Sequence, residues 1–156
     1  MANAKIDIVG QNELPAIAEI YNQMFRPTKD VAFFRRRFLG RYNPLILVAT
    51  LDDRPVGFFC GFELKPSTFF AWLYGVLPEF RQVGVASQLA DAAHAWAAEH
   101  DYSLVRFECQ NQHRAMLQMA ITLGYDIIGV RWDSDRNANL VIFEKTIGPG
   151  DSAGGD

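Results

Sequence analysis

The sequence predicts a mixed α/β fold with helices on both faces of a central sheet. Short apolar or alternating runs, bounded by turn residues, predict seven strands. Apolar residues at helical spacing predict four helices between them. In the middle of the chain a strand, a helix and another strand follow one another, which requires at least one parallel strand pair. The expected order is β-α-α-β-β-β-α-β-α-β-β.

The first half of the chain is expected to hold a strand, two helices and a three-strand meander. Asn12 can cap the first helix, which Pro27 ends. Asp30 can cap the second helix, and Gly40 suits its end. The expected strands are Lys5–Gly10, Leu45–Leu51, Val56–Leu64 and Thr68–Val76.

The second half alternates helices and strands and then closes with two strands. We expect residues 1–147 to form one domain. The last residues, 148–156, are rich in glycine and acidic, and we expect them to be disordered. The expected elements are helices at Val85–His100 and Gln112–Leu123 and strands at Ser103–Cys109, Asp126–Trp132 and Leu140–Ile147.

Composition limits the class of protein. The chain has 156 residues, 49% hydrophobic and 21% charged, as in ordinary soluble domains. Its net charge of -3 argues against a general nucleic-acid binder. It begins without a signal peptide and has no apolar run long enough for a membrane span. Cys60 and Cys109 each lie in an apolar run and are expected to be buried thiols, and the histidines are not spaced as a metal site. We therefore expect a cytoplasmic protein without a metal.

The most informative segment is the junction between the strand that ends at Val76 and the following helix. Backbone N–H groups at a helix start have no partner within the helix and lie at the positive end of its dipole. A pyrophosphate is a natural ligand for them. Gly84 and Ala86 allow the backbone to come close to a phosphate, and Arg81 adds positive charge. An ordinary strand–loop–helix junction is the alternative, since neither a P-loop nor a GxGxxG loop is present.

The string VLPEFRQVGVASQLADAAHAWA, which begins at Val76, resembles motif A of the GNAT acetyltransferases. The later Leu123-Gly124-Tyr125 resembles the end of the family's second motif. The resemblance covers most of the chain, from about Ile6 to Ile147. It implies the GNAT fold, in which a mixed, mostly antiparallel sheet splays in a V between the strands at 68–76 and 103–109.

The resemblance also implies acetyl-CoA as the acyl donor and an amine as the acceptor. The Tyr74 backbone N–H would face the acetyl carbonyl and stabilise the oxyanion. Val76 would bond the pantetheine arm. His113, at the start of a helix, could contact a phosphate or carry a proton. The pyrophosphate would be held by Arg81 and by the amides of Gln82, Val83, Gly84, Val85, Ala86 and Ser87.

The usual catalytic groups of the family are missing in part. The common acid is a tyrosine, and its position here is Ala120, five residues before Tyr125. Glu108 matches a glutamate that serves as base in members that acetylate the N-termini of ribosomal proteins. An ion pair of Glu108 with Arg106 or another arginine is the structural alternative, and Glu63 is a second candidate base.

Three functions remain open from the sequence. The first is an N-acetyltransferase that moves acetyl from acetyl-CoA to a primary amine by direct attack. The second is a CoA-binding regulatory or scaffold module with little or no turnover, suggested by Ala120. The third, a nucleic-acid-binding domain, rests only on the arginine run at 35–37, and the acidic total disfavours it. The sequence leaves the acceptor open, and it does not decide whether the chain forms a homodimer.

Overall fold

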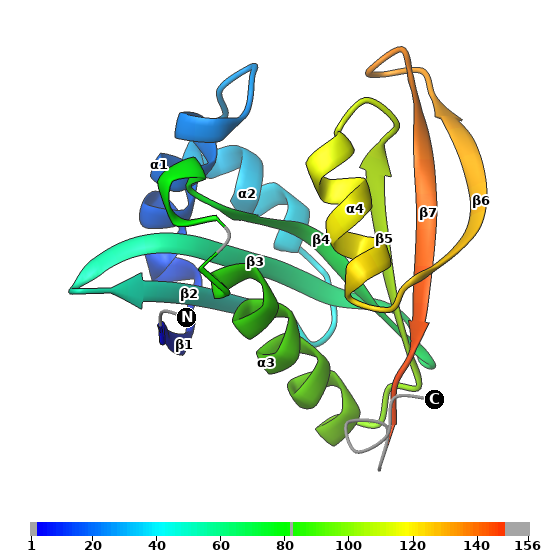
Figure 1. The fold of residues 1–156 in the computed structure, drawn as a ribbon, viewed down its shortest axis with the longest axis horizontal. Helices are drawn as coiled ribbons and strands as arrows, with labels where there is room; N and C mark the ends of the chain where they lie inside the picture. The colour runs from blue at the N-terminus through cyan, green and yellow to red at the C-terminus, as the bar shows by residue number, and fades with distance from the viewer. Residues whose placement is uncertain (1–2, 82, 149–156) are drawn as a thin grey trace. The chain divides into compact units, whose positions relative to one another are not determined.

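The computed structural model describes residues 3–81 and 83–148 (Figure 1). Gly148 apart, the tail expected at 148–156 lies outside the described residues. In the described part, no helix combines the length and apolar composition needed to cross a bilayer. The strands are β1 (Lys5–Val9), β2 (Leu45–Leu51), β3 (Arg54–Lys65), β4 (Thr68–Val76), β5 (Leu104–Gln110), β6 (Asp126–Asp133) and β7 (Ala138–Thr146). The α-helices are α1 (Leu14–Met24), α2 (Val31–Phe38), α3 (Val85–Glu99) and α4 (Arg114–Thr122).

The strands form a mixed sheet in the order β1-β2-β3-β4-β5-β7-β6. The β1–β2, β2–β3, β5–β7 and β6–β7 pairs are antiparallel, whereas β4 pairs with β5 in parallel. The parallel pair is the one that the strand–helix–strand order requires, because α3 connects β4 to β5. The predicted α/β class and element order are therefore confirmed. The β4–β5 pairs run only from Thr68↔Leu104 to Ala71↔Phe107, although both strands continue; the V-shaped splay itself stays a prediction.

The chain divides into two compact units. The first contains residues 3–63 and 73–93, and the second contains residues 64–72 and 94–148. β4 and α3 each contribute to both units. Whether the whole behaves as one domain stays a prediction.

Aromatic side chains fill the core of the first unit. Phe34, Phe58 and Phe62 are almost fully buried. α2 is held at its start by Asp30, whose carboxylate accepts a hydrogen bond from the Phe33 N–H at 3.0 Å, as predicted. The arginine run at 35–37 occupies the last turn of this helix, where positive charge complements the helix dipole.

Two glycines allow β3 and β4 to pack closely. A Cβ on Gly57 would lie 3.1 Å from the Gly75 carbonyl oxygen and 3.1 Å from a methyl group of Leu89 on α3. A Cβ on Gly75 would lie 2.8 Å from the end of the Met24 side chain. The backbone contact at Gly57 therefore leaves little room for a side chain, and a substitution there would require Gly75 of β4 or Leu89 of α3 to shift.

The second unit is built on the meander of β5, β7 and β6 with the start of β4. Phe69, Phe107 and Phe143 are buried in it. Arg106 of β5 donates two hydrogen bonds to one carboxylate oxygen of Glu144 on β7, at 2.6 and 3.0 Å. This partly buried, charge-assisted pair fixes two neighbouring strands to each other.

Both cysteines are free and buried, as predicted. Burial raises the pKa of the Cys109 thiol to about 11, and it raises the pKa of the Cys60 thiol further. Both thiols therefore stay protonated at neutral pH.

Two strands begin earlier than predicted, because the turns that precede them are shorter than their residue types indicate. β3 begins at Arg54, two residues early, because Asp52 and Asp53 both adopt positive φ and connect β2 to β3 as a two-residue hairpin turn. β7 likewise begins at Ala138, because Asp133 pairs with it across the loop. Acidic residues tolerate positive φ less readily than glycine, so these turns carry a weaker sequence signal.

Candidate active site

The end of β4 is held to β3 by a backbone contact. The Leu77 N–H donates to the Val56 carbonyl at 2.8 Å, and Val76 and Leu77 are both buried. A short 3-10 turn at Pro78–Phe80 follows, closed by a hydrogen bond from the Phe80 N–H to the Leu77 carbonyl at 2.9 Å. The chain therefore leaves the strand in one fixed direction.

Arg81 stabilises this exit. Its Nε donates to the Val76 carbonyl at 3.0 Å, and its Nη2 lies 3.6 Å from the Met24 sulfur. The guanidinium thus closes a five-residue loop and still carries its positive charge beside the start of α3. Its predicted contact with a phosphate is compatible with this geometry and stays a prediction.

The turn into α3 requires glycine. Gly84 has a φ of 91°, which side-chain-bearing residues rarely adopt. Its carbonyl accepts a hydrogen bond from the Gln88 N–H at 3.1 Å, which opens the helix. Val85 and Leu89 are fully buried and anchor the first turn, while Val83, Ala86 and Ser87 are partly or fully exposed. Gln82 lies outside the described residues.

The first amides of α3 consequently face an accessible surface. N–H groups in the first turn have no acceptor within the helix, and the helix dipole is positive there. A rigid, glycine-containing helix start of this kind suits an anion such as a pyrophosphate.

Tyr74 lies in β4, two residues before Val76, and is buried. Its ring packs edge-on near Phe59, with ring centroids 6.0 Å apart. Burial, followed by the negative charge of Asp91, raises the pKa of the phenol. The Tyr74 hydroxyl therefore stays protonated and is a poor base, which is consistent with a role for its backbone N–H alone.

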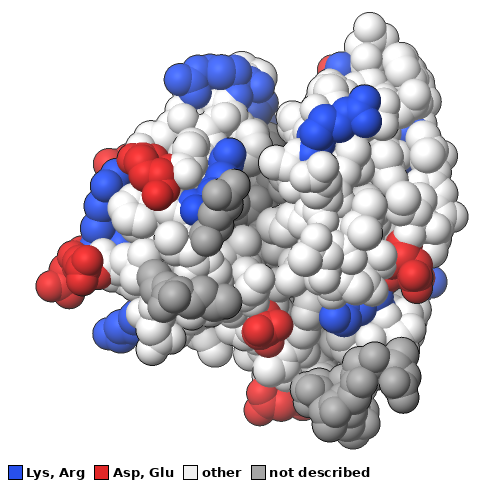
Figure 2. All heavy atoms as spheres, viewed as in Figure 1, with Lys and Arg blue, Asp and Glu red and all other residues white. Residues whose placement is uncertain are grey.

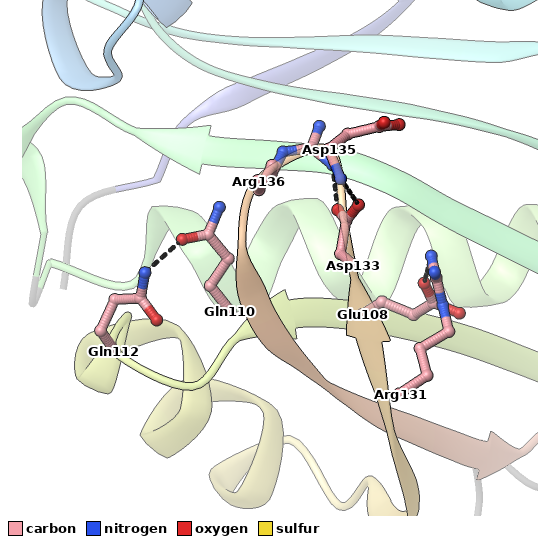
Figure 3. A network of polar contacts seen from close by, with 7 residues as sticks. All are labelled: Glu108, Gln110, Gln112, Arg131, Asp133, Asp135 and Arg136. Carbon is pink, nitrogen blue, oxygen red and sulfur yellow. Dashed lines mark hydrogen bonds and ion pairs between the residues drawn. The ribbon is translucent and has the colours of Figure 1, made fainter.

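Glu108 lies in β5, in the second unit, and its partner is an arginine of β6. The Arg131 Nη2 lies 3.0 Å from the Glu108 Oε1, with 14% of the Glu108 side chain and 52% of the Arg131 side chain exposed (Figure 3). Of the two pairings considered from sequence, the one with Arg106 does not occur. The contact neutralises Glu108 in part but leaves its role as a base untested.

The same end of the second unit carries further polar groups. The Asp133 carboxylate accepts hydrogen bonds from Arg136 at 2.7 Å and from the Asp135 N–H at 3.1 Å (Figure 3). The bond from Arg136 is the main reason that the pKa of Asp133 lies below its usual range. This arrangement holds the β6–β7 loop. No group of three potential metal ligands occurs within residues 3–81 and 83–148.

The other sequence candidates occupy different elements. His113 precedes α4 and is partly exposed, and its carbonyl accepts the Leu117 N–H at 3.0 Å. Glu63 lies within β3, which continues to Lys65. The loop residues belong to the first unit and Glu108 and His113 to the second. The candidate residues are therefore divided between the two units.

Sequence reasoning missed His94. Its Nε2 lies 2.6 Å from the Tyr125 hydroxyl, and the two rings are 5.5 Å apart. Ala120, at the expected position of the acid, is buried, and its carbonyl accepts the Tyr125 N–H at 3.0 Å. Nothing in the sequence links His94 to a tyrosine 31 residues away; only its place beside the apolar stripe of α3 hints at burial.

The comparisons with known proteins agree with this geometry. The model of the acetyltransferase (GNAT) family matches residues 14–125. No curated protein gives a significant match. The ribosomal-protein-S18-alanine N-acetyltransferase from Escherichia coli has a similar structure, with a TM-score of 0.80 at 14% identity over 94% of this chain and 96% of that chain.

Two further solved structures extend the likeness. Ard1 from Thermoplasma volcanium has a TM-score of 0.80 at 19% identity, over 94% of this chain and 99% of that chain. yncA from Salmonella typhimurium, solved with its cofactor acetyl-CoA, has a TM-score of 0.73 at 16% identity, over 93% of this chain and 94% of that chain. At these identities the likeness concerns the fold.

The His94–Tyr125 contact predicts a pH-dependent stability. Burial, and then the positive charge of Lys145, lowers the pKa of His94 to about 4 from an ordinary 6.5. Between these values the unfolded chain binds a proton that the folded chain does not, so the free energy of unfolding should fall as pH falls from 6.5 to 4. The shift corresponds to a loss on the order of 3 kcal/mol.

Urea unfolding at several pH values checks this. His94→Gln keeps a hydrogen-bonding side chain without a titrating group, and it should reduce the dependence of the free energy of unfolding on pH. His100→Gln, at an exposed position, is the control and should leave this pH dependence unchanged. Equal slopes for the wild type and His94→Gln would contradict the assignment.

Proposed function

The chain belongs to the acetyltransferase (GNAT) family, and on that premise we propose that it transfers the acetyl group of acetyl-CoA to a primary amine. The observation that carries the proposal is Gly84, which adopts positive φ directly before α3, where the first amides of the helix have no acceptor within it. The acetyl-CoA bound by the Salmonella typhimurium protein supports the choice of donor.

In this proposal the junction binds the donor. The described amides of residues 83–87, together with Gln82, hold the pyrophosphate, and Arg81 adds charge at its side. The backbone of Val76 bonds the pantetheine. The Tyr74 N–H stabilises the oxyanion that forms when the thioester carbonyl is attacked.

Glu108 then acts on the acceptor. An alkyl ammonium has a pKa near that of lysine, about 10, so at neutral pH it arrives protonated and cannot attack. Glu108 takes the proton directly or through a water. The amine nitrogen attacks the carbonyl carbon, the carbon–sulfur bond breaks, and CoA leaves as a thiolate, which takes up through solvent the second proton that the nitrogen loses as the amide forms. Its ordinary thiol pKa of about 8.5 makes the thiolate a tolerable leaving group without a tyrosine at position 120.

The acceptor class is a primary amine, of a small molecule or of a peptide or protein. The name of the Escherichia coli protein gives an alanine of the ribosomal protein S18 as its acceptor, so peptides that present an alanine amine belong in the panel to be tested. The second candidate function is a CoA-binding module with little turnover. It is favoured by one observation, the buried Ala120 in place of an acid.

The first test concerns the proposed pyrophosphate-binding loop around Gly84. Gly84→Glu and Gly84→Gln strain the backbone equally, but only glutamate places a carboxylate against the pyrophosphate. We expect both to weaken CoA binding, glutamate by at least about tenfold more than glutamine, since like charges in contact cost several kcal/mol. Titration calorimetry on folded variants measures this. Unchanged affinity in a folded Gly84→Glu variant would reject the loop as the CoA site.

The second test asks whether Tyr125 replaces the missing acid. Tyr125→Phe keeps the ring and leaves the partly buried His94 without its hydroxyl partner. We expect a loss of about 1 kcal/mol in stability and little change in kcat. Thiol release with acetyl-CoA and an amine panel gives kcat, and urea unfolding gives the stability. A large loss of kcat in the folded variant would show that Tyr125 donates a proton in the reaction.

The third test concerns the base. Glu108→Gln keeps the shape of the side chain and removes its basicity. General-base help is worth about 10²–10⁴-fold, so kcat/KM for a primary amine should fall within that range and recover in part at high pH, where free amine is abundant. CoA affinity should stay nearly unchanged.

Two matched variants make the result interpretable. Glu144→Gln breaks the other arginine–carboxylate pair of the same unit, with Arg106, and should leave kcat/KM nearly intact if only Glu108 acts chemically. Glu63→Gln tests the second candidate base. Full activity of Glu108→Gln at neutral pH would reduce Glu108 to a structural partner of Arg131.

A further inference from the structure

The outer strand of the second unit exposes large apolar side chains. β6 is the last strand in the sheet order and pairs with β7 (Figure 1). Within it Ile127, Ile128, Val130 and Trp132 are 57%, 51%, 61% and 57% exposed. Figure 2 shows a largely uncharged surface along the margin where Figure 1 places this strand.

Such an edge is unusual in a protein that remains monomeric. Edge strands in soluble proteins are commonly protected by lysine, by proline or by shortness, because their backbone groups can pair with another strand. β6 carries three charged residues and one irregularity, which protect an edge in part, but it has eight residues, contains neither lysine nor proline and exposes four large apolar side chains. We propose that β6 pairs antiparallel with β6 of a second copy, so that the two sheets continue across a two-fold axis.

The register between β6 and β7 shows which side chains share a face. Asp126 lies opposite Glu144 and Arg131 opposite Leu140, on one face of the sheet. Ile127 lies opposite Phe143 and Val130 opposite Val141, on the other face. The alternation shifts by one residue between Ile127 and Gly129, where the strand is irregular. Without that shift, Asp126 and Arg131 would lie on opposite faces.

Directly opposed residues of an antiparallel pair lie on the same face, which limits the two-fold registers. One such register places Asp126 opposite the partner's Arg131. Another places Asp126 opposite the partner's Asp133, which shares that face. The first makes two carboxylate–guanidinium contacts, and the second makes two carboxylate–carboxylate contacts. Charge therefore selects the first register.

Apolar contacts agree with this register. On the face opposite to Asp126 and Arg131, it places Ile127 of each copy against Val130 of its partner, which gives two apolar contacts. It also places Trp132 opposite the partner's Tyr125. Arg131 is half-exposed and has five N–H donors, so it can bind Asp126 of the partner subunit while it holds Glu108. The charge pattern of β6 is thus complementary to itself, which favours a second copy over an unrelated protein.

Disulfide cross-linking tests both the dimer and its register. In the double variant Ile127→Cys/Val130→Cys each new thiol faces its counterpart across the interface. Ile127 and Val130 lie opposite Phe143 and Val141, two strand positions or about 7 Å apart and at the limit for a disulfide within one chain, so the readout is the covalent dimer and not the loss of free thiol. The native thiols are buried. We expect oxidation to give a covalent dimer, seen on a non-reducing gel, with circular dichroism unchanged.

The matched control is Ile127→Cys/Trp132→Cys, which pairs only in the register that opposes Asp126 to Asp133. It should cross-link far less. Cross-linking of this control as strong as that of Ile127→Cys/Val130→Cys would overturn the register, because opposing Asp126 to Asp133 also sets Val130 opposite its own counterpart. A wild-type chain that sediments as a monomer at about 100 μM, with cross-linking in neither variant, would overturn the dimer itself.

A charge exchange gives an independent readout. Asp126→Arg and Arg131→Asp should each raise the dissociation constant of the dimer at least about tenfold, because each places two like-charge pairs at the interface. The double variant Asp126→Arg/Arg131→Asp restores opposite charges and should return the constant to within a few-fold of wild type. Failure of the double variant to recover would reject the proposed salt bridges. None of these measurements depends on acetyl transfer.

Discussion

The junction at the end of β4 depends on the close approach of backbone atoms at Gly57. A side chain there would collide with the Gly75 carbonyl of β4 and with Leu89 of α3, each 3.1 Å from the position of its Cβ. One glycine therefore lets β3, β4 and α3 meet at a single point. The hydrogen bond from the Leu77 N–H to the Val56 carbonyl lies beside this contact, and the turn at Gly84 follows along the chain. The candidate loop thus follows two strands that pack closely, with no side chain at position 57 between them.

The electrostatics of the second unit depend on how two arginines are distributed. Arg106 is fully committed to Glu144 through two short hydrogen bonds, whereas Arg131 makes one bond to Glu108 and stays half-exposed. A doubly bonded, partly buried pair is mainly structural. An exposed guanidinium contributes little to stability but can exchange partners. Glu108 is therefore held by the more labile of the two arginines, which fits its proposed role as a base.

The sequence was most informative where local chemistry decides the structure. Alternation located the strands, and Gly84 located the turn before α3 because a positive φ there requires a residue without a Cβ. The sequence did not predict contacts between residues that lie far apart in the chain. The pairing of Glu108 with Arg131 depends on the register of β5, β7 and β6, and a polar side chain such as His94 has no sequence signal for its partner at Tyr125. The sequence also did not predict that β6 is exposed, because the apolar residues of a strand do not show whether it lies at the edge or in the centre of a sheet.

Arg131 connects the proposed base to the proposed interface. In a single copy its positive charge lies beside Glu108 and opposes the approach of an ammonium. If the partner's Asp126 shares the same guanidinium, two carboxylates surround one cation, and the local charge changes from neutral to negative. A cationic acceptor would then be attracted to Glu108 more strongly in the dimer than in the monomer, by an amount that salt would screen. The irregularity between Ile127 and Gly129 is what places Asp126 and Arg131 on one face. In the proposed dimer, a one-residue distortion of an edge strand thereby decides whether the partner's Asp126 can reach the arginine that holds the proposed base.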